Sequence, residues 1–274
     1  MNIIDLSVFD CAIRVEYWDR RAGALLNGNY SGFEKSIRDP QISYRITHEG
    51  MGEERVIARK GACTELARDD AEFLYMFEKD MTIETQKLRR DLYFLHAAVL
   101  ELDGQALALV APSGYGKSTT TWGLLHHGLK YLSDELAPIC LETMRVHPFP
   151  HAVCLKEAPP ENYPLPKETI FTTRAAHVPT QFLPGPTIID PISLEAIFFV
   201  RFVSDISAPI LAPLGKGEAA ARLFTNALNP LAHGGEGLDG AIEIASRTHC
   251  FEMLSANLPR TCELIKSAVL SIRS

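Results

Sequence analysis

The segment from Ala106 to Thr121, ALALVAPSGYGKSTTT, constrains the fold of this chain more than any other stretch. A short apolar run leads into a loop of small residues, and a stretch compatible with a helix follows. Leu107 to Val110 can end a buried strand, and Ser118 to His127 can form a helix that Gly128 terminates. This order of strand, loop and helix is the context that a phosphate-binding loop requires. The alternative is a chance small-residue loop before an amphipathic helix.

The loop matches the motif G-x-x-x-x-G-K-[ST] at every defined position except the first. Gly116, Lys117 and Ser118 match the motif, and Ala111 stands where its first glycine belongs. Alanine is disfavoured there only if the position needs a positive φ, at a cost of roughly 1 kcal/mol or more. We expect Ala111 to be tolerated.

Inward-pointing backbone N–H groups and the positive end of a helix would both favour a polyphosphate at this loop. Lys117 would reach the outer phosphates of ATP, and the Ser118 hydroxyl would ligate Mg²⁺. Gly114 and Gly116 would relieve the backbone where the phosphates approach. The predicted nucleotide-binding residues are Ser113, Gly114, Tyr115, Gly116, Lys117, Ser118 and Thr119.

Length and composition restrict the remaining possibilities. The 274 residues are 46% hydrophobic, enough to bury the core of one large domain or two small ones. The net charge of -7 gives no footprint for nucleic acid or for an anionic membrane. The N-terminal residues lack the features of a signal peptide, and no apolar run approaches the ~20 residues of a membrane span. We therefore expect a cytoplasmic protein that binds neither nucleic acid nor membrane.

Six cysteines are scattered along the chain without a C-x-x-C pair or a histidine at zinc-finger spacing. This spacing favours small reduced core residues over a disulfide framework or a zinc site. The cysteines are Cys11, Cys63, Cys140, Cys154, Cys250 and Cys262.

Residues 1–90 are expected to form a small, mostly β N-terminal subdomain. Ala12 to Tyr17 alternates apolar and polar residues, and Ile42 to Thr47 and Glu54 to Lys60 also resemble strands. Asn27-Gly28 is a turn signal. Ala71 to Leu92 is helical in character and lacks proline, so one or two helices should end the subdomain.

Residues 91–274 are expected to form the α/β domain that carries the loop. Tyr93 to Leu102 reads as an apolar strand that contains His96, and Asp103-Gly104 is a strong hairpin signal before the strand that feeds the loop. After the loop helix, Lys130 to Ser133 forms a short strand that ends in Asp134-Glu135. Further expected elements are strands at 136–141, 153–156, 195–203 and 250–254, and helices at 217–228 and 258–272.

Three side chains are candidates for chemistry beside the loop. Asp134 and Glu135 lie where α/β sheets place ligands, so one carboxylate can bind a metal while the other accepts a proton from an attacking hydroxyl. The alternative is a solvated acidic pair at a strand end. His96, on the neighbouring strand, can bond a carboxylate or approach the phosphate, although a lone histidine on an apolar strand can equally be a core residue.

These residues resemble the HPr kinase/phosphorylase-like kinases through Leu95-His96, the loop SGYGKST and the segment GLKYLSDE. The resemblance spans 95–139 and is greater to a divergent branch that includes kinases of lasso peptide precursors. It implies a P-loop core like that of phosphoenolpyruvate carboxykinase, with ATP and Mg²⁺ as cofactors. His96 and Asp134 take catalytic roles by this resemblance, Asp134 as the base for a substrate serine, and Glu135 is a candidate metal ligand.

The resemblance also extends to Lys156 in PHAVCLKE, which is either a phosphate or substrate contact or a surface lysine. Ala111 and Glu135 depart from the usual glycine and aspartate of the family. The leading hypothesis is an ATP-dependent kinase, with Lys117, His96 and Asp134 as catalytic residues, that acts on a serine of a peptide or protein. Alternatives are a small-molecule kinase or carboxykinase-like enzyme and a non-catalytic nucleotide-binding module. Such kinases often form homo-oligomers.

Overall fold

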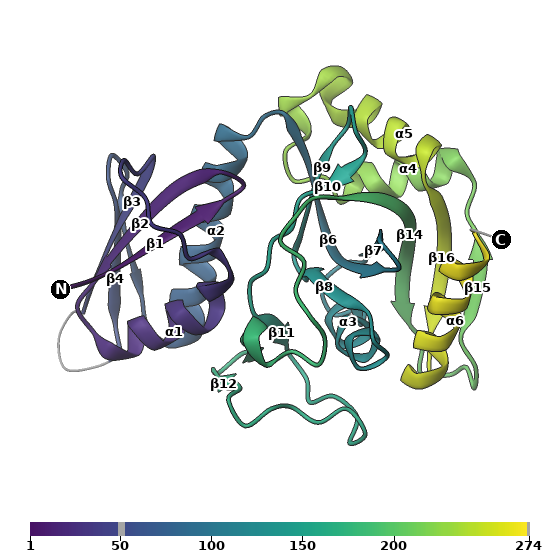
Figure 1. Cartoon of the computed structure of the whole chain (residues 1–274), viewed down its shortest axis with the longest axis horizontal. Helices are drawn as coiled ribbons and strands as arrows, with labels where there is room; N and C mark the ends of the chain where they lie inside the picture. Colours follow the sequence, from purple (N-terminus) through teal and green to yellow (C-terminus); the bar gives the residue numbers. More distant parts are fainter. Residues whose placement is uncertain (49–52, 273–274) are drawn as a thin grey trace. The chain divides into compact units, whose positions relative to one another are not determined.

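The chain forms a mixed α/β structure with several sheets (Figure 1). The computed structural model describes residues 1–48 and 53–272. The chain divides into two compact units: the first comprises Met1–Arg89, His151–Ala158 and Leu165–Phe182, and the second comprises Arg90–Pro150, Pro159–Pro164 and Leu183–Ser274. The chain therefore returns twice to the first unit after it has entered the second, a feature that the sequence patterns do not indicate.

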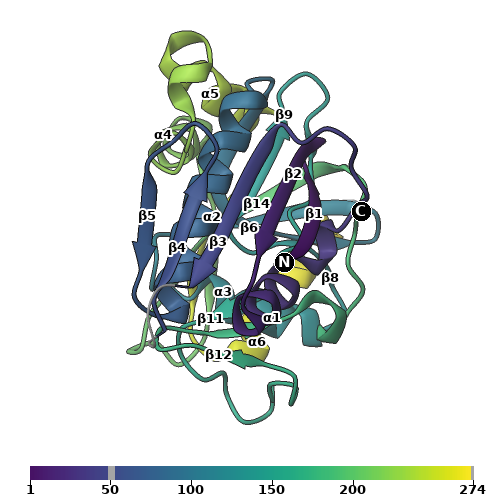
Figure 2. The ribbon, with the colours of Figure 1, turned by 90° about the vertical axis from the view of Figure 1, so that its left-hand side faces the viewer.

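The first unit contains a sheet with the strand order β1-β2-β3-β4-β5 (Figure 2). Its neighbouring strands pair antiparallel except for β2 and β3, which are parallel, so the chain must cross over between these two. Helix α1 (Arg20–Tyr30) lies in this crossover. The other elements up to Arg89 are β1 (Asn2–Val8), β2 (Cys11–Tyr17), η1 (Ser31–Phe33), β3 (Ile42–His48), β4 (Arg55–Arg59), β5 (Thr64–Ala67) and α2 (Asp70–Leu88).

Helix α1 corrects the turn expected at Asn27-Gly28, because both residues lie inside it. The Asp19 carboxylate caps the helix by accepting hydrogen bonds from the backbone N–H groups of Arg21 and Ala22. A Cβ at Gly28 would lie 2.2 Å from Cδ1 of Ile170, so the glycine permits close packing against the returning chain. Capping and tertiary packing thus override the local turn signal, and the first 90 residues hold more helix than expected.

The returning segments add a three-stranded sheet to the first unit, with the order β11-β13-β12. Buried His177, on β13, hydrogen-bonds through Nδ1 to the Asn29 side chain of α1, at 2.8 Å. The backbone N–H of Ala152 also donates to the Asn29 carbonyl, at 3.0 Å. The elements of these segments are β11 (Val153–Leu155), β12 (Ile170–Phe171), β13 (Ala176–Val178) and η2 (Thr180–Phe182).

The second unit is organised around a larger sheet with the order β10-β9-β6-β7-β14-β16-β15, and β8 also pairs with β6. Its central strands β7, β14 and β16 are mutually parallel. The strands are β6 (Leu92–Leu102), β7 (Gln105–Val110), β8 (Lys130–Ser133), β9 (Leu136–Cys140), β10 (Arg145–Val146), β14 (Ile192–Phe202), β15 (Ile210–Pro213) and β16 (His249–Ser255). The helices are α3 (Lys117–His126), α4 (Lys216–Thr225), η3 (Pro230–Ala232), η4 (Gly234–Gly237), α5 (Leu238–Arg247) and α6 (Leu258–Ser271).

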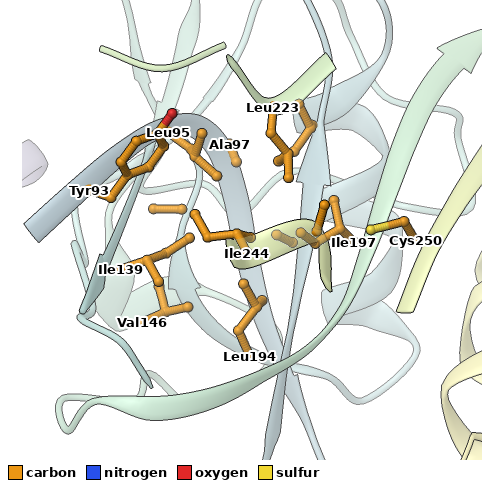
Figure 3. Packing of buried hydrophobic residues seen from close by; sticks show 14 of the residues in the cluster. Tyr93, Leu95, Ala97, Ile139, Val146, Leu194, Ile197, Leu223, Ile244 and Cys250 are labelled. Carbon is orange, nitrogen blue, oxygen red and sulfur yellow. The ribbon is translucent and has the colours of Figure 1, made fainter. Parts of the chain in front are cut away.

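One face of this sheet packs on α4 and α5 to form a hydrophobic core (Figure 3). Leu95 and Ala97 of β6 contribute to it, together with Leu223 of α4 and Ile244 of α5. Because successive side chains of a strand point to opposite faces, His96 points away from this core. Helix α3 contacts β6, β7 and α6. His96 therefore lies on the face of the sheet that α3 covers.

Several sequence predictions for this unit are confirmed. Asp103 and Gly104 form a two-residue hairpin turn with φ of 50° and 84°, and the strand ending at Ser133 has the expected bounds. Helix α5 (Leu238–Arg247) is not among the elements expected from the sequence. Within the part of the chain that the structure describes, no helix is both long enough and apolar enough to span a bilayer.

Candidate functional site

The loop between β7 and α3 begins at the end of a strand that is buried from Ala106 to Val110. Ala111 follows β7 and is itself buried, with 1% of its surface exposed. The φ angle of Ala111 is not positive. Alanine therefore meets no backbone strain where the motif has its first glycine.

Two later glycines of the loop do adopt left-handed backbone conformations. The φ angles of Gly114 and Gly116 are 86° and 89°. Between them, the carbonyl of Tyr115 accepts a hydrogen bond from the backbone N–H of Phe202, at 3.1 Å. The two glycines thus allow the loop to curve, and this hydrogen bond connects the loop to the end of β14.

Helix α3 starts at Lys117 with Gly116 as its N-cap residue, which supplies no side-chain cap. The first intrahelical bond runs from the Thr120 N–H to the Gly116 carbonyl, at 2.9 Å. The first N–H groups of a helix have no intrahelical acceptor and carry partial positive charge. This end of α3 is therefore suited to an anion, and the half-buried Ser118 and Thr119 lie in its first turn.

Sheet register brings His96 and Glu135 to the same edge as the loop. His96 pairs with Leu136 of β9, and the next residue of β6, Ala97, pairs with Val110, the last residue of β7. Strands β8 and β9 both run antiparallel to β6 along the same side, with Asp134-Glu135 interrupting them. The acidic pair therefore lies at a break between two strands, beside the start of the loop.

Three of the predicted side chains meet at this point. The Lys117 ammonium lies 2.7 Å from Nε2 of His96 and 3.3 Å from Oε2 of Glu135. His96 Nε2 and Glu135 Oε2 are 2.9 Å apart. Lys117 is only 6% exposed, whereas His96 and Glu135 are 28% and 33% exposed. A buried ammonium is thus paired with a carboxylate that solvent and ligands can reach.

The imidazole cannot satisfy both neighbours at once. A neutral Nε2 either accepts a hydrogen bond from Lys117 or donates one to Glu135. An arriving anion could therefore replace one of the contacts of the Lys117 ammonium. His96 would then donate its Nε2 proton to the Glu135 carboxylate. The arrangement is chemically suited to exchanging one anionic partner of Lys117 for another.

The remaining predicted residues lie in different surroundings. Asp134 is fully buried, with no exposed surface, while its neighbour Glu135 makes the contacts with Lys117 and His96. Ser113 and Tyr115 lie on the exposed part of the loop. Lys156 is exposed and follows β11 in the first unit.

The donor set suits a hard divalent cation held partly by other oxygen ligands. Ser118 and Glu135 offer a hydroxyl and a carboxylate, the oxygen ligands that Mg²⁺ prefers. In residues 1–48 and 53–272, no group of three or more His, Cys, Asp or Glu side chains is arranged to hold a metal ion. Mg²⁺ commonly uses one or two protein ligands together with water and phosphate oxygens.

Sequence analysis does not identify Phe202, although this residue contacts the loop directly. A Cβ built on Gly116 would lie 3.3 Å from Cβ of Phe202. The only signal in the sequence is that Phe202 is the second-last residue of EAIFFVRFV, where a parallel strand would reach the ligand edge of the sheet. The parallel pairing of β14 with β7 could not be read from that segment alone.

Comparison with known proteins gives no family assignment. No family model matches the chain, and no curated protein matches it by sequence. Among solved structures, the HPr(Ser) kinase/phosphatase from Coxiella burnetii matches with 13% identity and a TM-score of 0.32, covering 66% of this chain and 99% of that one. The likeness is distant, and no conclusion about function rests on it.

Proposed function

We propose that the chain is a kinase that uses ATP and Mg²⁺ to phosphorylate a serine hydroxyl on a peptide or protein. The observation that supports this most is the meeting of Lys117, His96 and Glu135 at the head of α3, directly after a glycine-curved loop. A buried ammonium beside uncapped helix N–H groups is suited to the outer phosphates of a nucleotide. The loop sequence and its local context agree with this role.

The side chains divide the work by charge and position. Lys117 and the backbone N–H groups of the loop would hold the β- and γ-phosphates, and Ser118 and Glu135 would hold Mg²⁺. The cation, when bound, neutralises charge that develops on the phosphates. His96 would keep Glu135 oriented when phosphate replaces the carboxylate beside Lys117. The P-loop core expected from the resemblance is part of this proposal.

The transfer itself exchanges one P–O bond for another. The serine oxygen attacks the γ-phosphorus, the bond from that phosphorus to the β,γ-bridging oxygen breaks, and ADP leaves with the bonding electrons. The serine proton passes to Asp134 as base. Asp134 has no exposed surface, so this role requires the residues around it to move and let the acceptor hydroxyl reach the carboxylate. Lys156 would contribute a further phosphate or substrate contact.

The test is transfer of label from [γ-³²P]ATP to serine peptides, each paired with a serine-to-alanine control peptide. We expect label on the serine peptide with wild type, and a loss of at least 100-fold with Lys117→Ala or Asp134→Asn. Lys167→Ala and Asp190→Asn, which change exposed residues, should transfer normally. Undiminished transfer by Asp134→Asn would reject Asp134 as the base, and would direct attention to Glu135→Gln.

The same assay separates the alternative functions. Label on small hydroxyl compounds but on no peptide would favour a small-molecule kinase or a carboxykinase-like enzyme. ATP binding without transfer to any acceptor would favour a non-catalytic nucleotide-binding module. The chain is also proposed to form a homo-oligomer.

A further inference from the structure

Two exposed aromatic side chains lie at the loop, and the phosphoryl transfer proposed above uses neither ring. Tyr115, within the loop, is 44% exposed, and Phe202, at the end of β14, is 55% exposed. Single exposed apolar side chains are common on protein surfaces. These two belong to segments joined by the hydrogen bond from the Phe202 N–H to the Tyr115 carbonyl. The two exposed rings therefore come from residues whose backbones are adjacent, and we call this pair the aromatic patch.

The exposure of Phe202 contrasts with its neighbours on the same face of β14. Phe198, Val200 and Phe202 share a face because side chains alternate along a strand. Phe198 is fully buried and stacks on Phe251 with ring centroids 5.2 Å apart, and Val200 is 3% exposed. The hydrophobic face of β14 thus ends in the exposed ring of Phe202, where the strand reaches the loop.

Sheet order places this ring on the opposite side of the loop from the reactive groups. Along the sheet β9, β6, β7 and β14 are successive neighbours, and the loop follows β7. His96 and Glu135 come from the side of β6 and β9, whereas Phe202 comes from β14. In Figure 1, β6 and β14 are seen on either side of β7.

We infer that Phe202 and Tyr115 form the platform on which the base of the nucleotide stacks. The inference rests on the proposed function. If the γ-phosphate lies toward His96 and Glu135, the nucleoside end of the same molecule extends to the other side of the loop, where the aromatic patch lies. Every nucleobase has a flat π-face that an aromatic side chain can cover, and such stacking tolerates different bases.

The topology favours a base over an aromatic side chain of the acceptor as the occupant. The acceptor hydroxyl must reach the γ-phosphate beside Asp134, and Asp134 lies on the β6 and β9 side. An acceptor group on the β14 side would be separated by the nucleotide from Asp134, the carboxylate that takes its proton. The patch therefore binds the nucleoside and raises the affinity for ATP, but it takes no part in phosphoryl transfer.

Calorimetric titration with two probes tests the platform: Mg²⁺ with ATP, and Mg²⁺ with inorganic tripolyphosphate, which lacks the base. We expect Phe202→Ala and Tyr115→Ala each to raise the Kd for ATP about tenfold or more. The Kd for tripolyphosphate should stay within about twofold. Phe202→Leu, which keeps an apolar side chain but removes the ring, should behave like Phe202→Ala. Phe224→Ala changes a partly exposed ring on α4 and should alter neither constant.

The outcomes separate the platform from the phosphate site. Unchanged ATP affinity in both alanine variants overturns the platform, as does equal weakening of ATP and tripolyphosphate, which would mean that the rings only shape the loop. Loss of ATP affinity in Phe202→Ala that Phe202→Leu restores also overturns it, because apolar bulk would then suffice. Wild-type protein that binds neither probe rejects the proposed function together with the platform.

Discussion

At the scale of single residues, Lys117 shows how the fold prepares a charge for a ligand. Its ammonium is 6% exposed, and it lies within 3.3 Å of both His96 Nε2 and the Glu135 carboxylate. Burying a charge is costly unless a partner compensates it, so Glu135 and His96 stabilise the lysine before any ligand arrives. A polyphosphate would supply the same compensation with greater charge.

Ala111, the residue that departs from the loop motif, provides a prediction at this scale. Because its φ is not positive, restoring the motif glycine in Ala111→Gly brings no relief of strain. The glycine makes the unfolded chain more flexible and removes a buried methyl group, so we expect the free energy of unfolding to fall by about 1 kcal/mol. ATP affinity should stay within about twofold. Urea denaturation and calorimetry measure the two quantities, and tighter ATP binding by the variant would contradict the account.

At the scale of elements, strand periodicity and turn chemistry predicted the second unit well. The Asp103-Gly104 hairpin, the strand 130–133 and the C-terminal strand and helix follow from local patterns. The residues of the candidate site could also be selected from the sequence, because a loop motif and two flanking segments carry them; their roles stay predictions. Helix α1 could not be predicted, because an Asn-Gly turn signal at 27–28 is overridden by packing against Ile170, which is distant in sequence. Phe202 was missed for the same reason: its contact depends on which strands pair.

The crossing of α3 and α6 depends on the absence of a side chain at Gly123. A Cβ at Gly123 would lie 2.8 Å from both Sγ of Cys262 and Cδ1 of Leu258. In Gly123→Ala, the cost of overpacking should exceed the gain in helix propensity, and we expect unfolding to become easier by about 1 kcal/mol or more.

Gly217→Ala in α4 is the matched control for this prediction. No atom lies within 4 Å of the added Cβ, so only helix propensity acts, and stability should rise by up to about 1 kcal/mol. Thermal or urea unfolding compares the two variants. If Gly123→Ala stabilised the protein as much as Gly217→Ala, the close crossing of α3 and α6 would be wrong.

The return of the chain to the first unit should make stability depend on pH through His177. Burial lowers the pKa of His177 from 6.5 to about 4, and the nearby His151 acts in the same direction. Between these two pKa values the unfolded chain binds a proton at His177 that the folded chain does not. The stabilising contribution of neutral His177 is therefore complete above pH 6.5. It is lost as the pH falls toward 4, by roughly 3 kcal/mol in total.

The measurement is urea denaturation of wild type and His177→Gln at several pH values between 7.5 and 4. The wild type should lose about 3 kcal/mol more than the variant over this range. Comparing slopes with pH rather than absolute stabilities allows for any direct effect of the substitution on folding. Parallel curves for the two proteins would mean that His177 is not held neutral in the first unit.

At the scale of the whole molecule, the two compact units have different relations to the proposed ligand. The loop, His96, Asp134 and Glu135 all belong to the second unit, so the proposed phosphate and metal contacts come from this unit, with Lys156 as the one candidate from the first. A ligand that binds only folded protein stabilises it, by about 2.7 kcal/mol at 100 times its Kd. Nucleotide should therefore protect the second unit from unfolding.

The most direct test of the central claim is calorimetric titration of ATP with Mg²⁺ into wild-type protein and into Lys117→Ala. We expect saturable binding at one site per chain in wild type, and a loss of at least tenfold in affinity when the buried ammonium is removed. Circular dichroism would establish that the variant is folded. Absence of binding by the wild type, or equal affinity in the two folded proteins, would contradict the claim that Lys117 and the head of α3 hold a polyphosphate.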